Sequence, residues 1–111
     1  MTEIESFRDE IRNLEVSQGD PYNWERHREK ALRLLRKVSG DVRAAIREGS
    51  FTPGEILTIA SLQSDWVELT RDGAIVEALK SWIEANRERE NTTEIRLYTI
   101  EAERMLSSVF I

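Results

Sequence analysis

The sequence predicts an all-α protein: a compact antiparallel bundle of five to six helices that forms a single domain over residues 1–111. Three observations lead to this class. Apolar residues recur three and four positions apart along most of the chain, which is the spacing of one helix face. Short capping sequences separate these stretches. A length of 111 residues provides for one hydrophobic core and leaves no room for a second.

The first part of the bundle begins with a helix expected over residues 2–16. Its inward face is expected to carry four apolar residues: Ile4, Phe7, Ile11 and Leu14. Asp20 is expected to cap a second helix, with Pro21 at its first helical position. Gly40 is expected to end this helix. A short helix over residues 42–48 is expected next.

The clearest local signal in the chain is a capping box. Thr52 is followed three residues later by Glu55, with a proline at the first helical position. This pattern predicts a helix that begins at residue 53 and extends to about residue 70. A break near residues 63–64 is allowed for, with Ser64 as the cap of a second segment.

Two further helices are expected, over residues 73–89 and from residue 92 to the C-terminus. The last one carries a heptad-like apolar seam of five residues: Ile95, Tyr98, Ala102, Met105 and Val109. Residues 92–100 are also rich in β-branched and aromatic residues, so a strand is the alternative there. A helix is favoured because the seam continues to residue 109 and a lone strand has no evident partner.

Charge is distributed unevenly along the chain, whose net charge is −5. Residues 1–20 and 48–111 are acidic, whereas residues 21–47 hold eight bases and three acids. The basic segment either faces an anionic partner or neutralises its acidic neighbours in the fold. The second interpretation is favoured, because an acidic protein repels nucleic acid at long range.

Four of these bases share one face of the second helix: Arg26, Lys30, Arg33 and Lys37. The expected role of this basic stripe is a solvated face partnered by the acidic first helix. Contact with a phosphate backbone is the alternative. A helix-turn-helix over residues 55–80 is disfavoured, because the stretch between its two helices is too long for the short turn of that motif.

Nothing in the sequence predicts an enzyme, a cofactor or a bound metal. Cysteine is absent, and His27 is the only histidine. We expect His27 to be at least half buried on the apolar face of its helix and to bind no zinc, since no acid is suitably spaced along that face. Trp24, three residues earlier, also breaks the Glu-x-x-His spacing of helical di-metal sites.

The sequence predicts a cytoplasmic chain that makes no membrane contact. Its first residues are acidic and lack the apolar core of a signal peptide. No apolar run approaches the about 18 residues that a membrane span needs.

Three apolar residues of the last helix do not fit its seam: Leu97, Ile100 and Ile111. The helical turn places them on the opposite side, where they are either covered by another part of the bundle or bound to another molecule. This is the strongest functional signal in the sequence, and it indicates association.

The function that follows is that of a small non-enzymatic protein-binding module. Regulators, adaptors, inhibitors and phage or immunity accessory proteins share this character, and the partner is either another protein or a second copy in a homodimer. The alternative is a nucleic-acid-associated protein that uses the basic stripe, although nucleic acid is an unlikely partner for an acidic chain. An enzyme whose site is assembled across several helices is a third possibility.

Overall fold

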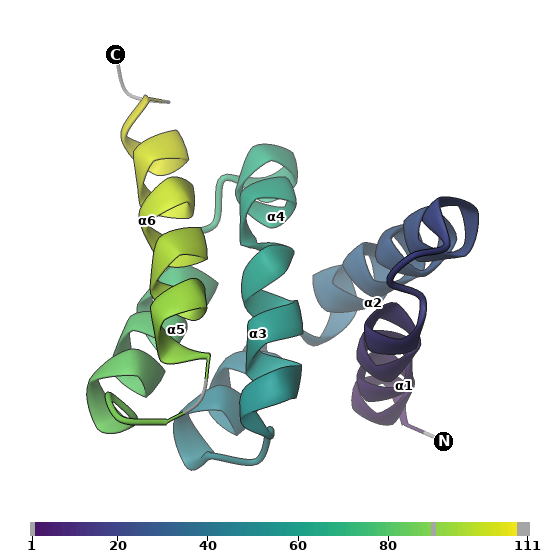
Figure 1. Cartoon of the computed structure of the whole chain (residues 1–111). Helices are drawn as coiled ribbons and strands as arrows, with labels where there is room; N and C mark the ends of the chain where they lie inside the picture. Colours follow the sequence, from purple (N-terminus) through teal and green to yellow (C-terminus); the bar gives the residue numbers. More distant parts are fainter. Residues whose placement is uncertain (1, 90, 109–111) are drawn as a thin grey trace. The chain divides into compact units, whose positions relative to one another are not determined.

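The computed structural model describes residues 2–89 and 91–108. Over these residues the protein is all-α, with six helices and no strand, as the sequence predicts (Figure 1). The alternative of a strand over residues 92–100 is wrong, because this stretch is helical. In chain order the helices are α1 (Glu3–Val16), α2 (Pro21–Glu48), α3 (Pro53–Ser61), α4 (Gln63–Thr70), α5 (Ala74–Ala85) and α6 (Thr92–Ser108).

The chain divides into two compact units, with the division between Val42 and Arg43. The N-terminal unit holds α1 and most of α2. The C-terminal unit holds the end of α2 and helices α3 to α6. That residues 1–111 behave as a single domain stays a prediction.

The N-terminal unit is a helical hairpin whose caps match the sequence prediction. Thr2 Oγ1 accepts a hydrogen bond from the N–H of Glu5 at 3.2 Å. Asp20 Oδ1 accepts one from the N–H of Asn23 at 3.3 Å at the start of α2. These bonds satisfy backbone donors that the first helical turn leaves free. Of the four residues predicted to face inward from α1, Phe7, Ile11 and Leu14 are buried, whereas Ile4 is only partly buried.

The predicted break between the second helix and the short one after it is present, but it lies at Val38 rather than at Gly40. Helix α2 consists of two helical segments joined by a kink at Val38, whose φ of −119° and ψ of 17° are not helical. Val38 and Val42 are buried on either side of Gly40. The helix ends at Gly49, whose φ of +75° is the left-handed conformation that glycine adopts freely.

The C-terminal unit begins with the predicted capping box. Thr52 Oγ1 accepts from the N–H of Glu55 at 3.1 Å, and Glu55 Oε1 accepts from the N–H of Thr52 at 2.9 Å. The predicted break between two helical segments is present, but Ser64 does not cap the second one. The N–H of Leu62 bonds to the carbonyl of Ile59, three residues back, and this tighter turn ends α3.

Helix α6 packs against α3, α4 and α5. Val67, Val76 and Ala102 form a buried cluster from α4, α5 and α6, and Met105 and Leu106 cover it. Contacts with three helices fix which residues of α6 face the core.

The observed inner seam of α6 differs from the predicted one. Tyr98 is 37% exposed, whereas Thr99 is only 2% exposed. Thr99 is tolerated in the core because its hydroxyl donates to the carbonyl of Ile95 at 2.8 Å and accepts from Gln63 Nε2 at 3.1 Å. Val109, the last residue of the predicted seam, lies outside the described residues.

Helix α5 ends at Ala85, before the expected residue 89.

Candidate functional site

The outer face of α6 carries two exposed apolar side chains. Leu97 is 62% exposed and Ile100 is 41% exposed. Ile95 is buried on the inner seam, and a turn of about 100° per residue carries positions 97 and 100 to the far side of the helix. These residues are exposed where the sequence places them, and their role in partner binding stays a prediction. Ile111, the third residue of the predicted face, lies outside the described residues.

Charged side chains of both signs surround these two residues. Glu94 and Glu101 lie on the Leu97 side, Arg96 lies on the Ile100 side, and Arg104 continues the row that Leu97 and Ile100 begin. All four are exposed, and none forms an ion pair with another residue in the described ranges. The face therefore combines solvent-exposed charges of both signs with apolar surface.

A shallow depression lies on the acidic side of this face. It is lined by Glu94, Leu97, Tyr98 and Glu101 and has a volume of about 250 Å³. A lining of two carboxylates, a leucine and a tyrosine suits a side chain with an apolar stem and a cationic end, such as arginine or lysine.

The basic stripe lies in the N-terminal unit, on α2. Arg26, Arg33 and Lys37 are exposed, and Lys30 is partly buried. Within the part of the chain that the structure describes, none of the four forms an ion pair, so the expected pairing with the first helix is absent. Elsewhere on this helix, Arg28 binds Glu25 and lies 5.8 Å from the centroid of the Trp24 ring. The hydrogen bond from Arg28 holds the pKa of Glu25 below its ordinary value.

His27 has a partner on the other helix of the hairpin. Its Nδ1 lies 2.7 Å from Glu10 Oε2, and the two side chains are 17% and 16% exposed. The predicted burial of His27 is therefore confirmed. The sequence did not identify Glu10, because spacing along one helix shows nothing of a partner on another helix.

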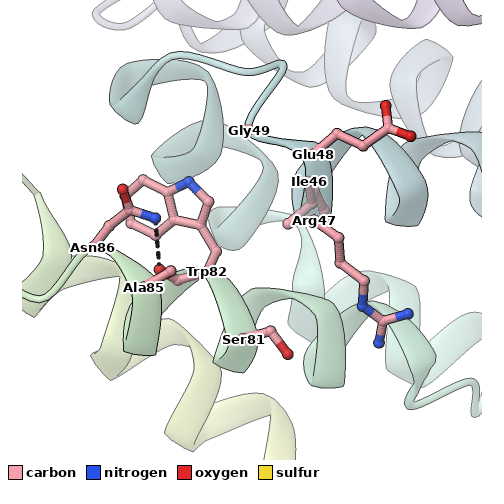
Figure 2. A pocket seen from close by; sticks show the side chains of 8 residues that line it. All are labelled: Ile46, Arg47, Glu48, Gly49, Ser81, Trp82, Ala85 and Asn86. Atoms are coloured by element: carbon pink, nitrogen blue, oxygen red, sulfur yellow. Dashed lines mark hydrogen bonds between the residues drawn. The ribbon is translucent and has the colours of Figure 1, made fainter.

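A second pocket, in the C-terminal unit, lies between the end of α2 and α5 (Figure 2). Its volume is about 270 Å³, and the side chains in Figure 2 line it: Ile46, Arg47, Glu48, Gly49, Ser81, Trp82, Ala85 and Asn86. Asn86 Nδ2 donates to the carbonyl of Trp82 at 2.8 Å, so this amide serves to end α5. The lining contains no nucleophile paired with a base.

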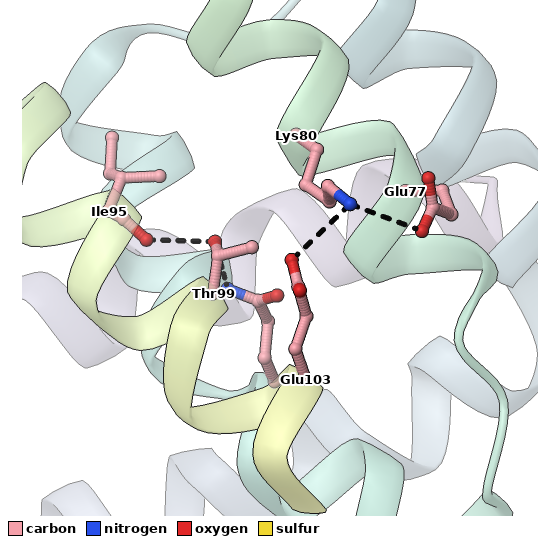
Figure 3. A network of polar contacts seen from close by, with 6 residues as sticks. Glu77, Lys80, Ile95, Thr99 and Glu103 are labelled. Carbon is pink, nitrogen blue, oxygen red and sulfur yellow. Dashed lines mark hydrogen bonds and ion pairs between the residues drawn. The ribbon is translucent and has the colours of Figure 1, made fainter. Parts of the chain in front are cut away.

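Two polar contacts connect α6 to its neighbours (Figure 3). On the surface, Lys80 of α5 lies 3.7 Å from Glu77 and 3.5 Å from Glu103. In the core, Thr99 joins Gln63 to the carbonyl of Ile95. Both sets of contacts position α6 and hold no reactive group.

Among the described residues, no three histidine, aspartate or glutamate side chains gather closely enough to hold a metal ion. None of the described helices is both long and apolar enough to cross a bilayer. Comparison of the chain with protein-family models, curated proteins and solved structures found no match.

Proposed function

We propose that this protein is a small, non-enzymatic, cytoplasmic protein-binding module that binds through the outer face of α6. The observation that carries the proposal is the exposure of Leu97 and Ile100 on a helix whose opposite side packs against α3, α4 and α5. Full burial of such a side chain from water is worth roughly 1.5–3 kcal/mol, and each of these two would gain the share that belongs to its exposed surface. A protein surface is the partner that supplies such burial together with groups for the surrounding charges.

The experiment compares three forms of the chain as bait for proteins of its native host: the wild type, Leu97→Glu with Ile100→Glu, and Leu69→Glu. Leu69 is a matched control, since it is also an exposed leucine, at 54%, but lies on α4. Each partner that is identified is then purified and titrated against the three forms by calorimetry. We expect binding by the wild type and Leu69→Glu and at least a hundredfold loss in the double variant. Equal binding by all three forms would overturn the proposal.

A nucleic-acid-associated role is the second candidate. The observation that favours it is the basic stripe, whose four cations have no ion-pair partner among the residues described. The net charge of −5 opposes it, because binding to a phosphate backbone normally rests on a basic domain. We therefore rank it below protein binding.

A further inference from the structure

We infer that the occupant of the α6 face is a second copy of this chain, packed parallel and in register against the first, with α6 on α6. This inference rests on the proposed function and names its partner. The grounds are the spacing of the exposed residues of α6 and the position of its unpaired charges.

The outer face of α6 has the spacing of a coiled-coil seam. Its central residues step by four, three, four and three positions: Thr93, Leu97, Ile100, Arg104 and Ser107. All five are exposed, although α6 already packs its inner side against α3, α4 and α5. Helix α6 thus carries two seams: the inner one packs against neighbouring helices, and the outer one is exposed.

The charges beside the outer seam select the parallel arrangement. Arg96 directly precedes Leu97, and Glu101 directly follows Ile100. In a parallel pair, the residue before one central position faces the residue five places later on the partner helix. Arg96 of each copy therefore faces Glu101 of the other, which gives two symmetry-related ion pairs.

The antiparallel arrangement is disfavoured by the same residues. In an antiparallel pair, residues on one flank of the outer seam face residues on the same flank of the partner helix. Glu94 of each copy therefore faces Glu101 of the other, which places two pairs of like charges together. The opposite flank would set Arg96 against Glu103. However, Glu103 already lies 3.5 Å from Lys80 of its own chain.

One contact opposes the parallel pair and limits its strength. Arg104 occupies a central position and meets its own copy across the two-fold axis. The long side chain can extend to water, and a polar residue at one central position fixes register at a cost in stability. With two large apolar residues per copy at the centre, we expect a weak dimer of the size class of transient interfaces.

The orientation can be tested by disulfide trapping, because the chain contains no cysteine of its own. In the parallel pair, Ser107→Cys lies beside itself on the partner, within the about 4.4–6.8 Å between Cα atoms that a disulfide spans. In an antiparallel pair centred between Leu97 and Ile100, residue 107 of one copy and residue 107 of the other are about 25 Å apart. We expect Ser107→Cys to form a covalent dimer on mild oxidation. Ser81→Cys, exposed on α5, is the matched control and should stay monomeric.

A mixture of Thr93→Cys and Arg104→Cys chains, distinguished by a tag, reports the opposite arrangement. These two positions meet only in the antiparallel pair, so a mixed covalent dimer, or no covalent dimer of Ser107→Cys, would overturn the inference.

Charge exchange provides a second test with variants that leave the core intact. We expect Arg96→Glu or Glu101→Arg alone to weaken self-association by about tenfold. Light scattering over a concentration series measures the association. The combined variant should restore it, since the ion pair is re-formed with its signs exchanged. Single variants as tight as the wild type, or no rescue, would contradict the pairing.

Failure here and failure of the proposed function are distinguishable. A wild type that stays monomeric at millimolar concentration overturns self-association, yet leaves the proposed function standing if Leu97→Glu with Ile100→Glu loses a purified partner. A monomer without any partner that depends on α6 overturns both.

Discussion

Gln63 Nε2 donates a hydrogen bond to Thr99 Oγ1 at 3.1 Å, although the two residues are 36 positions apart in the chain. Their side chains are 1% and 2% exposed. Thr99 Oγ1 donates in turn to the carbonyl of Ile95 at 2.8 Å. This buried polar contact joins α4 to α6 and sets which side of α6 faces outward.

We predict that Thr99→Val lowers the free energy of unfolding by about 1–3 kcal/mol. Valine keeps the shape of threonine but leaves the buried Gln63 amide with one partner fewer. Gln63 Nε2 retains the carbonyl of Ala60 at 3.2 Å, while Gln63 Oε1 has no hydrogen-bond partner within the described structure.

The double variant Gln63→Leu with Thr99→Val should cost less than the sum of the two single changes, because it removes both polar groups together. Urea unfolding of the four proteins measures this cycle. Additivity within about 0.5 kcal/mol would show that the hydrogen bond does not couple the two helices.

The contact between Glu10 and His27 should stabilise the N-terminal hairpin. We predict that Glu10→Ala and His27→Ala interact by about 1–2 kcal/mol in a double-mutant cycle, as expected for a partly buried hydrogen bond with a charged partner. Thermal unfolding at one fixed pH measures it. Glu29→Ala, which removes an exposed acid of α2, is the control and should change stability little.

Arg71→Gly should stabilise the protein by about 0.5–1 kcal/mol. Arg71 ends α4 with a φ of +58°, a left-handed conformation that strains every residue with a Cβ atom. Glycine relieves the strain, and the greater freedom of the unfolded chain removes part of that gain. Arg71→Ala separates loss of the arginine side chain from relief of the backbone, and we expect no stabilisation from it.

Thr52→Ala should lower the free energy of unfolding by about 1 kcal/mol, because it removes one bond of the capping box and leaves the Glu55 N–H without its acceptor. Ser81→Ala removes an exposed hydroxyl inside α5 and should have an effect below about 0.5 kcal/mol. Denaturant unfolding of both variants decides whether the loss is specific to the cap.

Binding to DNA or RNA should be weak at physiological salt, with a dissociation constant on the order of 10⁻⁵ M or poorer. The acidic net charge opposes approach of a phosphate backbone even though the basic stripe is unpaired. A fluorescence anisotropy titration over a range of salt concentrations measures it. Submicromolar binding that Arg26→Glu with Arg33→Glu abolishes would place nucleic acid ahead of protein as the partner.

Local chemistry by itself determined the helices and several of their ends. The capping box at Thr52 and the cap at Asp20 involve residues three positions apart, so their bonds follow from the sequence directly. Helical periodicity likewise placed Leu97 and Ile100 opposite Ile95, because the turn per residue of an α-helix does not depend on its neighbours.

Only the tertiary structure decided what each helix face touches. Thr99 replaces Tyr98 in the inner seam because Gln63, far along the chain, supplies a hydrogen bond that makes a buried hydroxyl tolerable. This contact between segments distant in sequence adds a free energy larger than the local preference, so spacing along one helix could not predict which residue is buried.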